Sequence, residues 1–315
     1  MLSNKLLDRI LALIRQGHDG VSDNDLFNEL ALSLHTFQAA RCKPIARLSQ
    51  KKPCDWREIP LVPVSLFSSN VIASFDVKNA IRVFESSGTT RNNVGRHYFE
   101  TLQLYEAASL QAADWALGEN RFKIISLWEK RDNSSLACMI DWISEKFGKA
   151  EFECEKDSQV LLIGAAFNYV EAIEKNQVFR LPKGSIAIET GGYKGRTREI
   201  PKDELYIMIS EKFSIPVSRI ISEYGMCELS SPLWEKPEEM RGFKIPPWVR
   251  IRILNPENLF DVDEGNIGAI AIYDLANVGS SIGILTADLG YIKEGRLHLK
   301  GRIKSAPIKG CSTTV

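Results

Sequence analysis

Residues 159–192, QVLLIGAAFNYVEAIEKNQVFRLPKGSIAIETGG, decide the fold. They open with an apolar run at 159–164, continue into a helical pattern at 165–175, and return to an apolar run at 184–188 that ends at a Gly-Gly turn. Short apolar runs bounded by glycine are typical of buried strands. Two such strands separated by a helix predict a crossover connection, and therefore parallel strands.

The same alternation extends on both sides of this unit. We expect further strands at 80–84, 123–127 and 219–223, and helices at 98–117, 134–147 and 203–213. From about residue 246 the expected strands follow one another without helices, at 249–254, 268–273, 290–293 and 297–300. At the N-terminus we expect helices before residue 17 and near 25–47, the second capped by Ser22 or Asp23.

The expected fold class is α/β, with a layered, largely parallel sheet covered by helices and a small antiparallel β-subdomain. Three parts are expected along the chain. Residues 1–50 form a helical segment packed on the body, residues 51–245 form the α/β body, and residues 246–315 form the β-subdomain with a short tail.

Composition excludes several classes of function. The chain has 315 residues, of which 44% are hydrophobic and 25% charged, as in soluble globular proteins. Forty basic residues balance forty acidic ones, so no charge pattern for nucleic acid is visible. No apolar run is long enough to span a membrane, and no signal peptide is evident. The six cysteines contain no Cys-x-x-Cys pair, which disfavours a zinc site or a disulfide framework. The expected compartment is the cytoplasm.

Four short polar segments carry the chemistry: ESSGTT at 85–90, ETGG at 189–192, EYGMCE at 223–228 and LTAD at 285–288. Three of them fall where predicted strands end, which is where open parallel sheets bind ligands. Together they supply hydroxyl and amide donors for a polyphosphate, an aromatic face, and two carboxylates. That set suffices to bind ATP and Mg²⁺ without a Walker lysine loop, and no such loop is present.

Each segment also has an ordinary alternative. The 86–90 loop can wrap phosphates with its amides and hydroxyls, or it can be a plain turn. Tyr224 can stack on a purine while Gly225 lets the backbone approach, and Glu228 can bind Mg²⁺ or be an exposed turn glutamate. Asp288, expected just before a strand, can accept ribose hydroxyls or form a turn. Arg302 can pair with a phosphate or the ribose, or be an exposed arginine.

The order of these motifs resembles the adenylate-forming enzymes, which include acyl-CoA synthetases, nonribosomal adenylation domains and luciferases. Within that superfamily the chain most resembles LuxE-type acyl-protein synthetases. The resemblance spans roughly residues 25–315, and its most specific motif is Glu-Thr-Gly-Gly-x-Lys-Gly-Arg at 189–196. The matching segments are 59–63 with Phe67, 86–90 with Arg96 and His97, 132–136, 164–167, 189–196, 222–229 and 309–312.

The resemblance implies ATP-dependent activation of a carboxylic acid to an acyl-adenylate. It implies that Glu228 binds Mg²⁺, that Gly191, Gly192 and Tyr224 frame the adenine, and that Asp288 with Arg302 holds the ribose. The residues it assigns to the triphosphate are Ser86, Ser87, Gly88, Thr89 and Thr90.

The resemblance also implies an acyl acceptor. LuxE-type enzymes carry the acyl group on a cysteine near the C-terminus before it passes to a reductase, and Cys311 occupies that place; the alternative is an incidental thiol. An acyl-carrier protein or an acyl reductase is the implied partner. His97 and Thr89 are the other candidate catalytic residues, although a structural histidine is a comparable explanation for His97. Phe167, Tyr169 and Trp234 are candidates for an apolar acyl pocket.

Three departures keep other functions open. Arg91, Cys227 and Ala287 replace a glycine, a threonine and a glycine of the superfamily pattern. They motivate a degenerate subunit that binds nucleotide or a partner without catalysis. The chain also ends soon after Arg302, where most relatives are expected to continue into a mobile C-terminal domain. Its absence argues against a second alternative, an ordinary acyl-CoA ligase, and agrees with the LuxE type.

Overall fold

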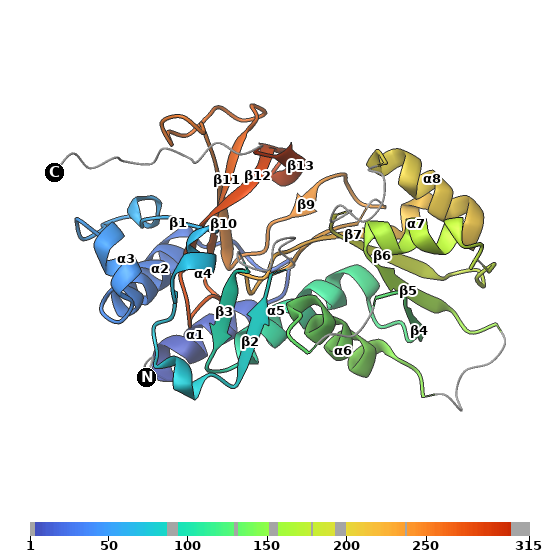
Figure 1. Cartoon of the computed structure of the whole chain (residues 1–315), viewed down its shortest axis with the longest axis horizontal. Coiled ribbons are helices and arrows are strands. Elements are labelled where there is room, and N and C mark those ends of the chain that lie inside the picture. The colour runs from blue at the N-terminus through green and yellow to red at the C-terminus, as the bar shows by residue number, and fades with distance from the viewer. Residues whose placement is uncertain are drawn as a thin grey trace.

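A computed structural model of the chain describes residues 4–86, 94–128, 132–150, 157–177, 179–192, 200–236 and 238–303. Figure 1 shows two halves that share one sheet. The α-helices are α1 (Asn4–Arg15), α2 (Asn24–Ala39), α3 (Lys43–Leu48), α4 (Leu66–Ser69), α5 (Gln103–Leu117), α6 (Ser135–Phe147), α7 (Ala166–Glu174) and α8 (Lys202–Phe213). The strands are β1 (Val62–Pro63), β2 (Arg82–Glu85), β3 (Arg96–Phe99), β4 (Lys123–Ser126), β5 (Val160–Gly164), β6 (Ile186–Thr190), β7 (Ile220–Tyr224), β8 (Leu233–Glu235), β9 (Phe243–Lys244), β10 (Val249–Leu254), β11 (Gly268–Asp274), β12 (Gly283–Lys293) and β13 (Arg296–Arg302).

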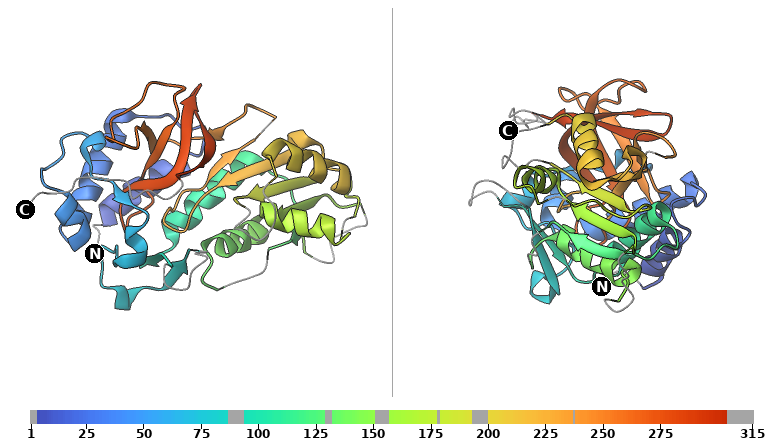
Figure 2. Two further views of the ribbon diagram at one scale, coloured as in Figure 1. Left: turned by 45° about the horizontal axis from the view of Figure 1, so that its top comes forward. Right: turned by 90° about the vertical axis from the view of Figure 1, so that its right-hand side faces the viewer.

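The predicted crossover unit is the centre of the parallel half. Strands β4, β5, β6 and β7 are neighbours in that order, and each pair is parallel. Leu161 and Ile163 of β5 pack with α5 and α6, whereas Val160 and Leu162 pack with α7 and α8. Successive side chains of a strand point to opposite faces, so an all-apolar strand requires helices on both faces. Figures 1 and 2 show α5 and α6 on one face and α7 and α8 on the other.

The antiparallel strands continue the same sheet. The order runs β10-β11-β12-β13-β9-β8-β7, and β1 adds to β12 in parallel. The antiparallel part therefore includes β8 and β9 as well as the strands expected after residue 246. Glu294 and Gly295 both have positive φ, as a two-residue hairpin turn between β12 and β13 requires. The α/β fold class with its antiparallel part is confirmed.

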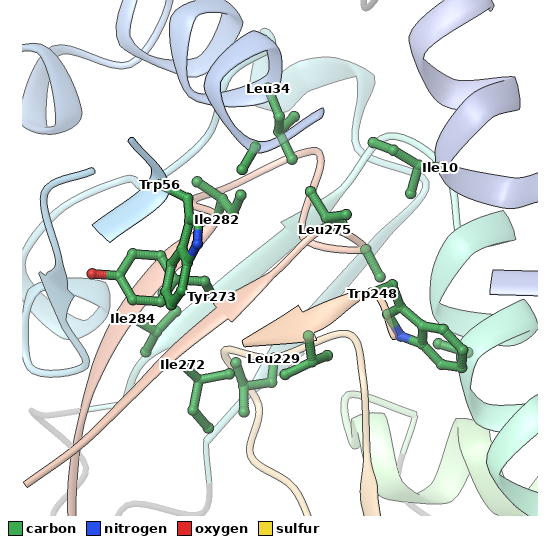
Figure 3. Packing of buried hydrophobic residues seen from close by; sticks show 14 of the residues in the cluster. Ile10, Leu34, Trp56, Leu229, Trp248, Ile272, Tyr273, Leu275, Ile282 and Ile284 are labelled. Atoms are coloured by element: carbon green, nitrogen blue, oxygen red, sulfur yellow. The ribbon is translucent and has the colours of Figure 1, made fainter. Parts of the chain in front are cut away.

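The N-terminal helices cover the antiparallel strands. Asp23 caps α2, because its side chain accepts a hydrogen bond from the amide of Leu26 at 2.9 Å. Figure 3 shows Ile10 of α1 and Leu34 of α2 beside Leu275. Trp56 packs edge-on against Tyr273 of β11, with ring centroids 4.9 Å apart. Burial of these large side chains joins the helical segment to the sheet.

Three expected elements have different limits. The helix at 25–47 divides into α2 and α3, because Pro44 stands at the start of a new helix. The helix at 98–117 begins only at residue 103, because 96–99 form a strand that pairs with β2. In that strand residues 97 and 99 are buried and residues 96 and 98 are not, which is the period of a strand. The strand expected at 290–293 begins at residue 283.

The described helices were also compared with what a bilayer requires. None of them is both long enough and apolar enough to cross a membrane.

Candidate active site

The carboxyl ends of β6 and β7 bring two of the polar segments together. Thr190 lies opposite Glu223 in the parallel register, so Gly191 and Tyr224 reach the same edge of the sheet. The Thr190 hydroxyl donates a hydrogen bond to Glu223 Oε2 at 2.5 Å. Gly191 and Gly192 both have positive φ, and the space beside their Cα atoms holds no described atom within 4 Å. Among the described residues the Gly-Gly turn thus has no close neighbour on this side, as a ligand-binding turn requires.

Gly225 has a structural reason of its own. A Cβ atom at this position would lie 2.4 Å from Glu223 Oε1, so any larger residue would have to displace that carboxylate. The missing side chain therefore admits the buried Glu223 carboxylate, which the sequence did not indicate. A role of Gly225 toward the nucleotide stays a prediction.

Tyr224, Asp288 and Arg302 form one connected group. The Tyr224 hydroxyl donates to Asp288 Oδ2 at 2.9 Å, and Arg302 Nε lies 2.9 Å from Asp288 Oδ1. Burial, followed by the Asp288 charge, raises the pKa of Tyr224 well above its ordinary value, so Tyr224 remains a donor. A carboxylate offers about four acceptor positions. Asp288 therefore keeps acceptor capacity for a further pair of hydroxyls.

The sequence led us to expect Asp288 just before a strand, and the structure differs from this expectation. Asp288 lies within β12, opposite Arg302 of β13, next to a register shift at Leu289 and Gly290. The shift is a bulge, which redirects side chains beside a site. Ala287 is also within β12 and has no positive φ, so alanine in place of glycine causes no strain there.

Glu228 is a buried carboxylate beside the start of the 86–90 loop. Only 7% of its surface is exposed, and its Oε1 lies 2.8 Å from where a Cβ atom of Gly95 would be. Gly95 and Ser86 are joined by two hydrogen bonds, from Gly95 N to Ser86 Oγ at 2.8 Å and from Ser86 N to Gly95 O at 2.9 Å. The missing side chain of Gly95 thus leaves room for the Glu228 carboxylate beside the backbone that pairs with Ser86.

The charge of Glu228 is poorly compensated. Burial raises its pKa, and the Asp288 charge adds to this; a hydrogen bond from its own backbone amide and the Arg302 charge offset the rise only in part. No described basic side chain lies within ion-pair distance of its carboxylate. The described residues also contain no cluster of three metal-binding side chains. One buried carboxylate fits Mg²⁺ if phosphate and water oxygens supply the remaining ligands, as Mg²⁺ commonly requires.

His97 is buried between the β2–β3 hairpin and the 224–228 loop. Its Nδ1 lies 2.8 Å from the carbonyl oxygen of Cys227, and a carbonyl only accepts, so Nδ1 carries the hydrogen. Burial lowers the pKa of His97 to about 4. The imidazole is therefore neutral near pH 7, with its lone pair on Nε2. It can position neighbouring groups, but it provides no positive charge for a phosphate or carboxylate.

The segment that carries Glu228 is held by a polar network that the sequence did not reveal. Asp274 accepts hydrogen bonds from the Ser230 amide at 3.0 Å and the Ser231 hydroxyl at 2.7 Å. Asn277 Nδ2 donates to the carbonyl oxygen of Glu228 at 2.9 Å. Asp274 ends β11 and Asn277 follows it, and the two form no recognisable motif, so only their position in the fold identifies them.

The predicted site residues are thus placed as follows. Residues Ser86, His97, Tyr224, Glu228, Asp288 and Arg302 form one region, with Gly191 and Gly192 at the same sheet edge. The residues outside the described ranges are Ser87, Gly88, Thr89, Thr90, Arg91 and Cys311. Of the acyl-pocket candidates, Tyr169 is a core residue whose hydroxyl donates to the carbonyl oxygens of Leu162 and Ile188, and Trp234 is fully buried.

Comparison with known proteins shows the protein family to which this chain belongs. A sequence model described as acyl-protein synthetase, LuxE, matches residues 115–315. Two long-chain-fatty-acid–luciferin-component ligases are similar. That of Vibrio harveyi is 24% identical over 297 residues, covering 83% of this chain and 78% of the relative. That of Aliivibrio fischeri is 23% identical over 300 residues, covering 82% and 78%.

Solved structures share the fold at low identity. ATP-bound MatB from Rhodopseudomonas palustris aligns with a TM-score of 0.52 and 15% identity, over 73% of this chain and 49% of MatB. This chain therefore spans about half the length of MatB. A 2-hydroxyisobutyryl-CoA ligase in complex with 2-HIB-AMP aligns with a TM-score of 0.67 and 12% identity, over 89% of this chain and 68% of that ligase.

Proposed function

Because the chain belongs to the LuxE family of acyl-protein synthetases, we propose that it is an AMP-forming ligase that joins a carboxylic acid to a protein thiol. In the first step a carboxylate oxygen attacks the α-phosphorus of ATP. The bond from that phosphorus to the bridging oxygen of pyrophosphate breaks, which gives an acyl-adenylate and pyrophosphate. In the second step a thiolate attacks the acyl carbon, a thioester forms, and AMP leaves.

The described residues suit the first step mainly by positioning. The Tyr224–Asp288–Arg302 group presents acceptor capacity for ribose hydroxyls at the sheet edge that also carries the Gly-Gly turn. Holding both reactants in line supplies much of the rate of such reactions. Mg²⁺ at Glu228 would neutralise phosphate charge. His97, neutral and fixed through Cys227, orders the loop between these groups.

One observation carries the proposal. The Tyr224 hydroxyl contacts Asp288 at 2.9 Å, although 64 residues separate them and they lie in the two halves of the sheet. Two motifs inferred separately from the sequence therefore meet at one place. Glu228 and Ser86, where the proposed phosphate loop begins, both lie next to Gly95.

For the second step we propose Cys311 as the acyl acceptor, with an acyl-carrier protein or an acyl reductase receiving the group afterwards. Cys311 lies outside the described residues. Its support is the family membership and the motif at 309–312. We place the reaction in the cytoplasm, where ATP is available.

ATP–pyrophosphate exchange with Mg²⁺ and a panel of carboxylic acids tests the first step. We expect exchange with at least one acid, and exchange with none would favour the degenerate subunit. Labelled acid then tests the second step. We expect label on the denatured protein that hydroxylamine releases, and Cys311→Ser should abolish this label while exchange continues. Label transferred to CoA, with none on the protein, would instead favour an acyl-CoA ligase.

A further inference from the structure

An apolar cavity of about 250 Å³ lies directly beside His97. Its wall combines the N-terminal helices with α5, β3 and the turn after β11. The residues that matter for size are Leu7, Phe37, His97, Phe99, Leu104 and Val278. None of Phe167, Tyr169 and Trp234 lines it, so the cavity lies elsewhere than the sequence suggested.

The polar groups of the wall are mostly bonded to protein. The Tyr105 hydroxyl donates to the Ser135 carbonyl at 2.8 Å, and the Ser74 hydroxyl donates to the Val278 carbonyl at 3.1 Å. The Ser230 hydroxyl donates to Asn277 Oδ1 at 2.6 Å. The described lining contains no lysine or arginine and includes Glu100. Such a wall favours hydrocarbon, and a second carboxylate placed there would be buried without a partner.

The cavity adjoins the proposed active site through one side chain. His97 lines the cavity, and its Nδ1 contacts the Cys227 carbonyl, one residue before Glu228. The neutral imidazole is compatible with an apolar neighbour on that side. The cavity and the segment that carries Glu228 thus contact the same imidazole.

Resting on the proposed function, we propose that this cavity holds the apolar tail of a monocarboxylic acid of medium size. A cavity of roughly 150 Å³ accommodates benzene, so about 25 Å³ serves each carbon atom. At that ratio the 250 Å³ cavity holds about ten carbon atoms. The acid is therefore a medium-chain or phenylalkyl acid, shorter than a long-chain fatty acid.

Phe37 and Leu7 limit the outer end of the cavity. Both are only partly buried. Phe37 lies on α2, and the guanidinium carbon of Arg41, just beyond the end of that helix, lies 4.1 Å from the centroid of the Phe37 ring. A longer tail must displace this ring and its cation–π contact. The N-terminal helices thus set the length of tail that is accepted.

The test measures ATP–pyrophosphate exchange with butanoic, decanoic and hexadecanoic acids in the full chain. The wild type should prefer decanoic acid over hexadecanoic acid by at least tenfold in kcat/KM. Val278→Phe, which fills the cavity, should lower kcat/KM for decanoic acid at least tenfold and affect butanoic acid far less. Phe37→Ala should shift the ratio of hexadecanoic to decanoic acid upward by about tenfold, the effect of a few methylene contacts.

Each variant is judged by the ratio of its kcat/KM values for two acids, measured on one preparation. Such a ratio does not depend on the fraction of the protein that is folded. Phe179→Ala serves as the matched control, because Phe179 is half-exposed and packs on Phe213, away from the cavity. A wild-type preference for hexadecanoic acid, or ratios unchanged in Val278→Phe, would overturn the inference and leave the ligase proposal intact. If no acid supports exchange, the ligase proposal fails. Thermal stabilisation by decanoic acid that Val278→Phe removes would then still establish the cavity, and its absence would refute it.

Discussion

Glu228→Gln should make the free protein more stable while weakening its use of magnesium and ATP. The Glu228 carboxylate is 7% exposed and has no described basic partner within ion-pair distance. Burial raises its pKa above the ordinary value of 4.5, so the native state holds this proton more tightly than the unfolded state. The free energy of unfolding therefore falls as the pH rises from about 4.5 through the native pKa. Glutamine keeps the shape and removes the charge.

The magnitude follows from burying a carboxylate that its own backbone amide and the Arg302 charge compensate only in part, and incomplete compensation of a buried group costs about 1–3 kcal/mol. A change of about 1 kcal/mol moves the Tm of a large domain by roughly 2 °C. The Tm of Glu228→Gln should thus exceed that of the wild type by a few degrees at about pH 8, and the difference should shrink toward about pH 5. Saturating Mg²⁺ and ATP should stabilise the wild type, by about 2.7 kcal/mol at a hundredfold excess over Kd, and the variant much less.

Glu235→Gln is the matched control with the opposite sign. Burial would raise the pKa of Glu235, but the Lys202 ammonium and the Gly242 amide lower it. That carboxylate therefore stabilises the fold above its unfolded pKa, and its replacement should lower Tm most at high pH. A Glu228→Gln variant that is less stable than the wild type at about pH 8 would show that the protein itself compensates this carboxylate.

Two further substitutions test the neighbouring groups. Tyr224→Phe keeps the ring but removes the hydrogen bond to the charged Asp288, and such bonds contribute about 1.5–3 kcal/mol. We therefore expect KM for ATP in the exchange assay to rise about tenfold. An unchanged KM would show that this hydrogen bond plays no part in ribose binding. His97→Asn retains a donor for the Cys227 carbonyl, whereas His97→Ala leaves that carbonyl unpaired. In urea denaturation the free energy of unfolding of His97→Ala should therefore be lower than that of the wild type by about 1–3 kcal/mol. Because the pKa of His97 is about 4, exchange in the wild type should show no inflection from this residue near pH 6.5; an inflection that His97→Asn removes would contradict the neutral imidazole.

Strong periodic patterns made the parallel half predictable. The run at 159–164 gave β5 almost to the residue, since an all-apolar strand with a helix behind it has few other arrangements. The 96–99 strand was not predicted, because its alternation is only four residues long and a helical pattern follows directly. Residues 96–99 form a strand because they pair with β2, and such pairing cannot be read from the local sequence pattern.

The candidate site also combines features that the sequence predicted with features that it did not. Motif order identified Tyr224, Glu228 and Asp288, and their meeting in one region needed no more than the edge rule for parallel sheets and the resemblance. The Asp274 network and the cavity beside His97 escaped prediction, since each combines residues from distant elements with no shared motif. Of the acyl-pocket candidates, Tyr169 and Trp234 are buried in the core, where aromatic residues occur as readily as in a pocket, and their role toward the acid stays a prediction.

The seam between the two halves of the sheet has a mechanical consequence. In the described chain Trp234 and Lys244 are the register pair that joins β8 to β9, and two pairs join β9 to β13. Tyr224 stands on one side of this seam and Asp288 with Arg302 on the other. A nucleotide bound by residues on both sides would link the two halves where few strand pairs do so. We therefore expect bound nucleotide to make the two halves unfold together, in a single cooperative transition.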